Sequence, residues 1–517
     1  MKKQTGINLI AQVIAFGINL GISFFLTPFI VEKIGVEANG FVSLANNFVE
    51  YAQLITISIN SMAGRFITIK LHQKNPEDAN KYFSSVFIAN LIFSVVLTIL
   101  SIIVITFIDK FMNISTAILT DVRILWGFIF GNFILGLFTS TFNVSTFVKD
   151  RLDLNAFCNI KGYIIRIIIL LVCYIVFDIH VWYIGLALFC MGLYNLIKNI
   201  NYAKTLTPEL KISKSSFNIK AIVELLKSGI WNTISKLSSI LSSGLDLLIT
   251  NIFINATAMG VLSLAKTIPT IILSLFGTIA AIFAPSLTIS YAKGDSIEIK
   301  DQLNSSIKIL GILSSIPLAI LIGFGKEFYS LWAPTQDSSL LYILTLINCA
   351  NLIFALPLEP LYNVFTATNK IKTSSLALIS FSTLSLATTF VLLKLVPDDT
   401  NLKMFVILGV SSFYNIVRVL TFLPMYGAKC LNFKLNTFYG PIIKNTISVV
   451  ILSIIGLAIK YILNINSWIM LIFSCILIGL LGLTINSTII LDKSERRDFY
   501  NKLKEKLKGL KNNATNS

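Results

Sequence analysis

Residues 82–108 read YFSSVFIANLIFSVVLTILSIIVITFI and contain no Lys, Arg, Asp or Glu. An uncharged apolar run longer than about 20 residues can cross a bilayer as a helix. The rest of the chain is similar, because 55% of its 517 residues are hydrophobic and only 13% are charged, about half the ~25% of an ordinary soluble domain. This composition excludes a soluble enzyme, a secreted disulfide scaffold and a disordered chain, and it predicts an all-α integral membrane protein.

Fourteen stretches of suitable length and apolarity are predicted to span the membrane as helices. They cover residues 7–31, 40–64, 82–108, 124–147, 155–177, 181–200, 229–253, 259–289, 306–325, 339–365, 375–396, 404–425, 446–465 and 467–491. The second, seventh and eighth are the most polar. The first is interpreted as a retained span and not as a signal peptide, because it is too long and lacks a clear cleavage site.

Cysteine and histidine usage argues against catalytic chemistry. The six cysteines have no regular spacing and the chain has only two histidines, which predicts neither a disulfide framework nor a metal site. No GxxxxGK[ST] sequence occurs, so no built-in ATPase is predicted. We expect a protein that is not an enzyme and uses no cofactor.

Basic residues are distributed unevenly between alternate loops. With the N-terminus inside, 32 of the 42 are assigned to inside segments, Lys161 and Arg166 among them, and six to outside loops. The remaining four, Lys236, Lys266, Arg418 and Lys460, lie within spans. This bias predicts a membrane protein with both termini cytoplasmic. It accounts for the net charge of +17 through contact with the anionic inner leaflet, without a nucleic-acid partner.

An internal repeat organises the chain. Residues 40–46 (GFVSLAN) recur as residues 260–266 (GVLSLAK), and further identities keep the same offset of 220 over about 100 residues. Six spans return the chain to the same side, so the copies are predicted to be parallel six-helix repeats. The predicted domains are an N-terminal six-helix lobe (1–200), a cytoplasmic linker (201–228), a C-terminal six-helix lobe (229–428), two extra transmembrane helices (429–491) and a basic cytoplasmic amphipathic tail (492–517).

Ionisable residues within spans are rare and costly, at roughly 2.5–3.5 kcal/mol each if they faced lipid at mid-bilayer. Six stand out: Glu50, Lys236, Asp246, Lys266, Glu359 and Arg418. Span seven also carries polar residues at helical spacing, which places them on one face. These are Asn232, Ser235, Lys236, Ser239, Ser242, Ser243, Asp246 and Thr250. We therefore predict a wet cavity lined by the polar faces of the spans that begin each repeat.

Cations in this cavity suggest an anionic substrate. Lys236 and Lys266 lie at different predicted depths and could hold an anion successively as access switches. Asn232 and Ser239 are predicted to line the cavity beside them.

The carboxylates admit more than one role. Glu50 and Asp246 are interpreted as coupling or charge-balancing groups, although Lys236 and Asp246 could simply neutralise one another. Glu359 and Arg418 are predicted to form a gating or structural ion pair. No catalytic residue and no metal ligand is predicted.

Two passages carry a family resemblance. They are NLIAQVIAFGINLGISFFLTPFIVEKIGVEANGFVSLAN (residues 8–46) and MGVLSLAKTIPTIILSLFGTIAAIFAPSLTISYAKGD (residues 259–295). The chain resembles, over essentially its whole length, the Wzx-type polysaccharide and oligosaccharide flippases, which form the polysaccharide-transporter branch of the MOP flippase superfamily. The six-plus-six-plus-two layout is similar to the MATE-like architecture of that superfamily.

The resemblance implies a transporter that flips an undecaprenyl-pyrophosphate-linked oligosaccharide across the plasma membrane by alternating access, for cell-surface polysaccharide biosynthesis. It implies a cationic cavity, which Lys236 and Lys266 match best. The expected partners are the lipid-linked oligosaccharide and membrane lipids, with a polysaccharide polymerase and glycosyltransferases as candidates, and the protein is expected to be a monomer.

Three alternatives stay open. A MATE-like cation-coupled small-molecule or drug antiporter would depend most on Glu50 and Asp246. A lipid-linked peptidoglycan precursor flippase is disfavoured because span one has no Arg or Lys between Ile7 and Val31. A membrane glycosyltransferase or polymerase is disfavoured because the longest outside loop, about 109–123, is too short for a catalytic domain.

Overall fold

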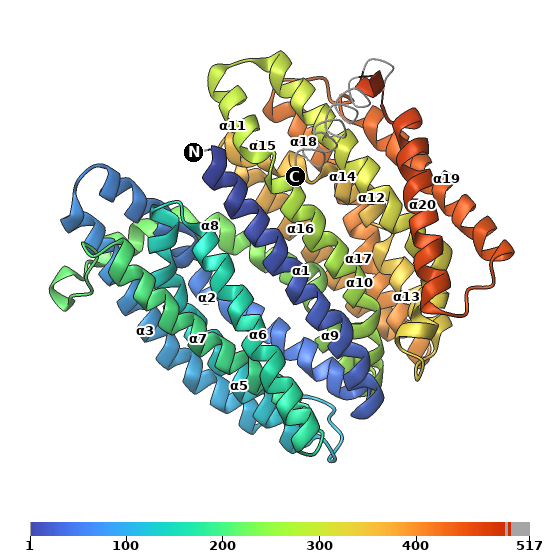
Figure 1. Ribbon diagram of the computed structural model, residues 1–517, viewed down its shortest axis with the longest axis horizontal. Coiled ribbons are helices and arrows are strands. Elements are labelled where there is room, and N and C mark those ends of the chain that lie inside the picture. The colour runs from blue at the N-terminus through green and yellow to red at the C-terminus, as the bar shows by residue number, and fades with distance from the viewer. Residues whose placement is uncertain (1, 492–494, 498–517) are drawn as a thin grey trace, which may run out of the picture. The chain divides into compact units, whose positions relative to one another are not determined.

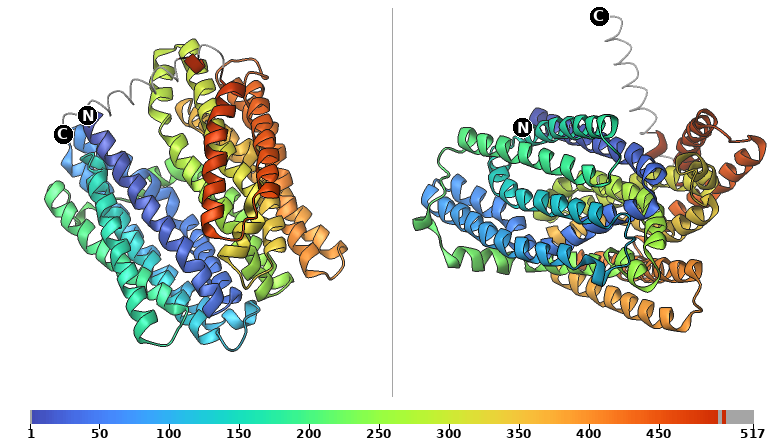
Figure 2. Two further views of the ribbon diagram at one scale, coloured as in Figure 1. Left: turned by 45° about the vertical axis from the view of Figure 1, so that its right-hand side comes forward. Right: turned by 90° about the horizontal axis from the view of Figure 1, so that it is seen from below.

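The computed structural model describes residues 2–491 and 495–497, and the regular structure within them is helical, without a strand (Figures 1 and 2). Each of the fourteen predicted spans falls on one or more helices. The predicted amphipathic tail, 492–517, lies outside the described residues except for Glu495–Arg497.

The first half of the chain forms seven long helices and several short elements. They are α1 (Lys2–Lys33), α2 (Val36–His72), α3 (Pro76–Thr106), α4 (Ile108–Phe111), α5 (Leu119–Val148), α6 (Leu152–Val176), α7 (Trp182–Leu206), the 3-10 turn η1 (Lys214–Ser216), α8 (Ile219–Ser239), the π-helical segment η2 (Ile240–Gly244) and α9 (Asp246–Phe253).

The second half is more often interrupted. Its helices are α10 (Ala256–Ala281), α11 (Ala284–Lys293), α12 (Ser296–Trp332), α13 (Ser338–Cys349), α14 (Leu352–Leu358), α15 (Pro360–Ala367), α16 (Ile371–Leu395), α17 (Thr400–Leu420), α18 (Phe422–Cys430), α19 (Tyr439–Ile462) and α20 (Trp468–Ile489).

Local sequence explains where many of these helices begin and break. Asn75 caps α3 by accepting a hydrogen bond from the Asp78 amide, and Asp295 caps α12 in the same way; both satisfy amides that have no partner within the helix. Proline in the first turn needs no amide hydrogen bond, so α11 starts just before Pro285. The predicted tenth span is bent by 42° between α13 and α14.

The structure supports many spans but does not establish fourteen. Among the described residues, eleven helices are long and apolar enough to cross a membrane, or twelve if the bent pair α13–α14 is one span. The helices that fall short are α2 and the α8–η2–α9 segment, which match two of the three predicted spans with the most polar residues. The chain is therefore a multi-span all-helical membrane protein, and the exact number of crossings stays a prediction.

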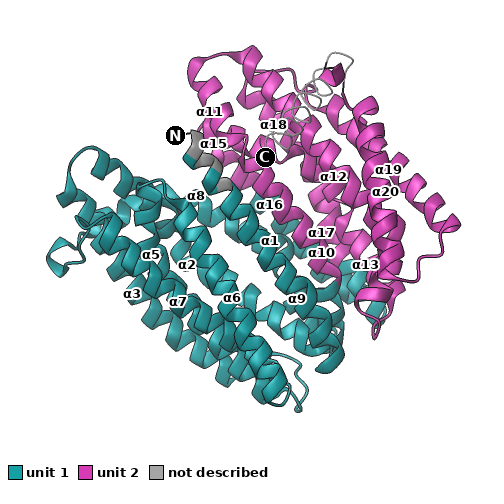
Figure 3. Cartoon of the chain, viewed as in Figure 1, with its two compact units in different colours: residues 1–264, 378–407 teal, residues 265–377, 408–517 magenta. Residues whose placement is uncertain are grey.

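The helices fall into two compact units (Figure 3). Unit 1 contains the chain up to Leu264 together with Leu378–Ile407, and unit 2 contains Ala265–Ala377 together with the described residues from Leu408 onward. These limits differ from the predicted lobes, because α8 and α9 belong to unit 1, where α8 packs along α2. The predicted lobe boundaries remain a prediction.

Helix α2 is central in unit 1, where it packs against α3, α5 and α8, while α5 pairs closely with α7 (Figure 1). Gly229 allows α8 to approach α2, because a Cβ atom there would lie 2.0 Å from the Ser58 carbonyl oxygen. The Ser58 hydroxyl in turn donates to the Leu226 carbonyl at 3.1 Å. This close approach fixes the register between α2 and α8.

A second close approach in unit 1 joins the starts of the two sequence repeats. A Cβ atom on Gly260 in α10 would lie 2.2 Å from the Val36 carbonyl oxygen, and one on Gly40 in α2 would lie 2.9 Å from Gly260 Cα. Asn39 Nδ2 donates to Ser263 Oγ beside this contact, at 2.9 Å. Gly40 and Gly260 are equivalent positions at the offset of 220. The contact therefore joins matching positions of the two sequence copies within unit 1.

Helix α12 is central in unit 2 and packs against α13, α14, α19 and α20 (Figure 2). Small and polar residues bring these helices together, as is common in membrane proteins. Gly311 of α12 lies against the Asn445 side chain of α19, and Asn486 Nδ2 of α20 donates to Ser315 Oγ at 2.6 Å.

Candidate functional site

Two polar stripes run along α2. Asn46, Gln53 and Asn60 recur every seven residues and so lie on one helical face; all three line a cavity within unit 1. Asn47, Glu50 and Tyr51 lie on another face, which meets α8 and η2. Helix α2 therefore contributes polar side chains both to the cavity and to the contact with α8 and η2.

An ion pair connects α2 to α8. Lys236 Nζ donates to Glu50 Oε2 at 3.0 Å, and Asn232 Nδ2 donates to Ser61 Oγ at 3.0 Å. The side chains of Lys236 and Glu50 are 23% and 46% exposed, so this is a partly open pair. The structure thus brings together a predicted substrate residue and a predicted coupling residue. Ser239, the last residue of α8, is exposed.

A π-helical segment interrupts the polar seventh span. Widening the helix over Ile240–Gly244 leaves the Gly244 carbonyl available, and it accepts hydrogen bonds from Asn47 Nδ2 at 3.0 Å and Tyr51 Oη at 2.6 Å. Asp246 follows directly at the start of α9 and is only 6% exposed. Single-turn π segments occur often at functional sites, and this one places a buried carboxylate beside α2.

The cavity on the other side of α2 has a volume of about 600 Å³ and is lined from α2, α5, α6 and α7. Seven asparagines and one glutamine line it, and none of its lining residues is charged. They are Asn46, Asn60, Asn132, Asn143, Asn155, Asn159, Asn195 and Gln53. Each amide offers both hydrogen-bond donors and an acceptor, so the wall suits a neutral ligand rich in hydroxyl or amide groups.

Several of these amides are available to a ligand. Asn195 Nδ2 donates to Asn159 Oδ1 at 3.3 Å. Across the part of the chain that the structure describes, the side chains of Gln53, Asn132 and Asn155 make no hydrogen bond. Gly192 leaves room for one of them, because a Cβ atom there would lie 2.2 Å from Asn132 Oδ1. Polar groups that face a cavity without protein partners are positioned to bind water or solute.

Arg166 corrects the assignment made from sequence. It was counted there with a cytoplasmic loop, but it lies in the middle of α6 and is only 8% exposed. Its Nη1 donates to Asn19 Oδ1 of α1 at 3.4 Å, and its Nε has no partner within the described residues. Unit 1 therefore contains a buried cation that was not among the predicted intramembrane charges.

The remaining predicted residues lie in unit 2. Lys266 is a partly buried residue of α10. Glu359 lies between α14 and α15, and Arg418 acts on it electrostatically. Among the described residues, however, the Arg418 guanidinium bonds to Tyr362 Oη at 2.7 Å and to Asn415 Oδ1 at 3.4 Å, not to Glu359. Arg418 therefore acts on Glu359 without a direct hydrogen bond, and the gating or structural role of the two residues stays a prediction.

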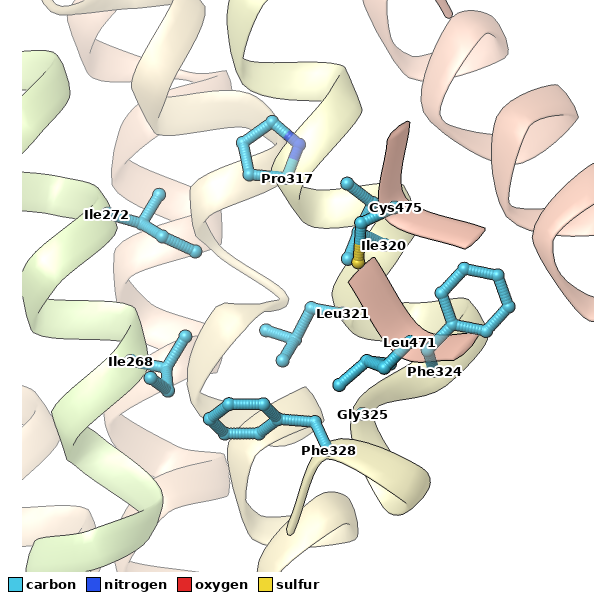
Figure 4. Close-up of a pocket in the computed structure, with 10 residues that line it drawn as sticks. All are labelled: Ile268, Ile272, Pro317, Ile320, Leu321, Phe324, Gly325, Phe328, Leu471 and Cys475. Atoms are coloured by element: carbon cyan, nitrogen blue, oxygen red, sulfur yellow. The ribbon is translucent and has the colours of Figure 1, made fainter. Parts of the chain in front are cut away.

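A second cavity of about 240 Å³ lies in unit 2 and has a different chemistry. Figure 4 shows Ile268 and Ile272 of α10 on one side and Leu321 and Phe328 of α12 on the other, with Leu471 of α20 closing it. Its lining is apolar apart from backbone and one cysteine. This pocket offers nothing to a polar solute.

The described residues contain no group of three or more His, Cys, Asp and Glu side chains that could hold a metal ion. The amide cavity was not predicted, because the predicted cavity lies between the polar faces of the spans that begin each repeat. Its signal was nevertheless present in the seven-residue spacing of Asn46, Gln53 and Asn60, and in the four-residue spacing of Asn155 and Asn159.

Known proteins place this geometry in context. The chain is 29% identical to the "Uncharacterized membrane protein EpsK" of Bacillus subtilis (strain 168) over 464 residues, which cover 89% of this chain and 90% of that protein. The fold matches an inward-facing multidrug resistance MATE family transporter of the MOP superfamily with a TM-score of 0.66, at 13% identity, covering 82% of this chain and 98% of the other. It matches the lipid II flippase MurJ, in an inward closed conformation, with a TM-score of 0.64 at 14% identity, covering 95% and 98%.

The likeness to MATE and MurJ confirms the predicted fold class, an all-helical MOP-type architecture. The sequence itself matches the family described as "Polysaccharide biosynthesis protein" over residues 1–288. That match covers more than half of the 517 residues, and the chain therefore belongs to the polysaccharide biosynthesis protein family.

Proposed function

We propose that this protein flips a lipid-linked oligosaccharide across the bacterial plasma membrane by alternating access, for the biosynthesis of cell-surface polysaccharide. Family membership and the MOP-type fold support transport in polysaccharide biosynthesis. The carrier lipid is an undecaprenyl pyrophosphate in this proposal, and both termini are cytoplasmic.

The observation that carries the proposal is the uncharged, amide-lined cavity in unit 1. A sugar exposes many hydroxyl groups that lose their hydration when they leave water, and each must regain a hydrogen-bond partner. Gln53, Asn132 and Asn155 present such partners from three different helices. An apolar or charged drug would gain little from these groups.

The test uses a strain in which the gene is deleted. Deletion is expected to remove surface polysaccharide, and the wild-type gene should restore it. Asn132→Leu and Asn155→Leu, which keep side-chain volume while removing an amide, should restore it poorly. Asn201→Leu, on an exposed position of α7 outside the cavity, is the matched control. Unchanged surface polysaccharide in the deletion strain would refute the function.

A second candidate, cation-coupled export of small molecules, is favoured by one observation. Asp246 is a buried carboxylate next to the π segment, and Asp246 and Glu50 both act electrostatically on Tyr51, as a cation-coupling site would require. In that case Asp246→Asn would raise drug susceptibility and leave surface polysaccharide intact. The reverse pattern, loss of polysaccharide without a change in drug susceptibility, supports the flippase.

A further inference from the structure

Arg166 is a buried cation whose charge is not neutralised by the described protein. It is only 8% exposed and lies near the centre of α6, with one long hydrogen bond to Asn19 and an Nε atom that has no partner within the described residues. No carboxylate of the described residues lies within salt-bridge distance of it. By contrast, Lys236 of the same unit pairs with Glu50, and Arg151 at the start of α6 pairs with Asp153.

A buried charge without a counterion lowers the stability of the folded protein. Burial of an ion is unfavourable unless an opposite charge and further hydrogen bonds compensate it. A guanidinium has five donors in a planar fork that matches phosphate. Arg166 uses one of these donors within the described protein, so it has unused capacity for an anion.

The order of chemistries along α6 indicates which anion. Asn155, Asn159, Arg166 and Leu170 are spaced by four, seven and four residues, which puts them on one helical face. Asn155 and Asn159 line the amide cavity. Arg166 follows about 10 Å further along the axis, and Leu170 about 6 Å beyond that. Leu170 lines a different cavity, which is apolar.

That apolar groove lies between α1 and α6 and has a volume of about 600 Å³. Isoleucine, leucine and phenylalanine side chains dominate its lining, with Gly21 of α1 widening it. Asn19, the partner of Arg166, stands between groove residues Ile18 and Gly21 on α1. The buried cation is therefore located where the groove begins.

We propose that Arg166 binds the phosphate of a polyprenyl phosphate carrier, whose chain lies in the α1–α6 groove and whose sugars reach the amide cavity. In such a molecule the phosphate lies between the sugars and the hydrocarbon chain. Along α6, the Arg166 guanidinium likewise lies between the amide cavity and the apolar groove. This assignment rests on the proposed function, because it names the part of the protein that would hold each part of that substrate.

The first experiment measures binding of undecaprenyl phosphate to the purified full-length protein in nanodiscs. Arg166→Gln should weaken binding at least about tenfold, as expected for loss of a charged hydrogen-bonded pair, and Arg166→Lys should restore part of it. Arg65→Gln, an exposed position of α2, is the control and should bind like the wild type. Equal affinity of the wild type and Arg166→Gln overturns the proposal.

Further probes identify what Arg166 recognises. Undecaprenol has the chain but no phosphate. Its affinity for the wild-type protein should be no higher than the affinity of the Arg166→Gln variant for undecaprenyl phosphate. Phosphatidylglycerol should compete weakly. If it competes as well as undecaprenyl phosphate, Arg166 holds an ordinary lipid headgroup and the proposal is wrong.

The groove has an independent test that leaves Arg166 in place. Gly21 lines the groove and a Cβ atom there meets open space, whereas Gly17 has equal space but does not line the groove. Gly21→Leu should weaken binding of undecaprenyl phosphate severalfold and leave binding of the short farnesyl phosphate unchanged. Gly17→Leu should change neither. If Gly21→Leu and Gly17→Leu changed the binding of undecaprenyl phosphate equally, the assignment of the carrier chain to the groove would be wrong.

A structural role of Arg166 predicts a different result. If the residue only ties α6 to α1, Asn19→Ala, which removes its hydrogen-bond partner, should lower both melting temperature and binding as Arg166→Gln does. In our proposal Asn19→Ala retains binding. Should the deletion strain keep its polysaccharide while these binding results hold, the proposed function fails and the phosphate site stands.

Discussion

Lys236 and Glu50 test, at the scale of single residues, whether intramembrane charges act as a pair. Lys236→Glu or Glu50→Lys alone would bring like charges together between α8 and α2, whose backbones are held close at Gly229. We expect each to lower stability, and the double exchange to recover about 0.5–3 kcal/mol, the usual coupling between contacting residues. Melting temperatures of the four purified proteins measure this. If the double variant lost as much stability as the two single variants together, the ion pair would contribute nothing to stability.

Single residues also show the limit of prediction from sequence. The charges of Lys236 and Glu50 could be recognised because they interrupt apolar runs, but their pairing depends on the register that Gly229 and Ser58 set between two helices. Arg166 lies within the predicted span 155–177 but was assigned to an inside segment, so it was not counted among the intramembrane charges. Its burial follows from the packing of α6 against α1, which no local pattern shows.

The α8–η2–α9 element makes a second prediction. The Gly244 carbonyl accepts from both Asn47 and Tyr51, so one donor remains if the other is removed. Tyr51→Phe or Asn47→Leu alone should cost no more than about 1 kcal/mol, the net value of one hydrogen bond. The double variant should cost more than the sum, because the carbonyl is then left without a partner. Thermal unfolding would reveal this, and strictly additive costs would contradict it.

Elements as a class were largely predictable, and the exceptions have a physical cause. Apolar runs specify helices in a membrane because backbone groups cannot be satisfied otherwise, and prolines mark breaks such as the start of α11. The segment Ile240–Gly244 contains no proline. Its π geometry is stabilised by side chains of α2, so only the tertiary structure shows it. The Asn-rich cavity likewise needs four helices to assemble.

At the scale of the whole molecule, the number of crossings decides where the termini lie. Eleven crossings would put them on opposite sides, whereas twelve or fourteen would put both on the same side. The excess of basic residues in alternate loops predicts both inside. Green fluorescent protein fused after residue 517 should therefore fluoresce, and alkaline phosphatase fused there should be inactive. Active phosphatase would place the C-terminus outside, which contradicts the prediction and, with the N-terminus inside, requires an odd number of crossings.

The contact between Gly40 and Gly260 gives a final prediction about the two repeats. A methyl group on Gly260 would lie 2.2 Å from a backbone carbonyl of α2, which can move only if α2 and α10 separate. Overpacking of this kind costs about 1–3 kcal/mol or more, and the ~1 kcal/mol gained from replacing glycine in a helix offsets only part of it.

Gly277→Ala isolates that helix-propensity gain, because a Cβ atom at Gly277 of the same helix α10 meets nothing within 4 Å. We expect Gly277→Ala to raise the melting temperature slightly, and Gly260→Ala to lower both the melting temperature and the surface polysaccharide of a complemented strain. Gly40 and Gly260 are equivalent positions of the two sequence copies, so a larger side chain at either one acts on both copies at this contact. If the Gly260→Ala protein were as stable and as active as the Gly277→Ala protein, α2 and α10 would not be tightly packed at this contact, and the two repeats would not meet through it.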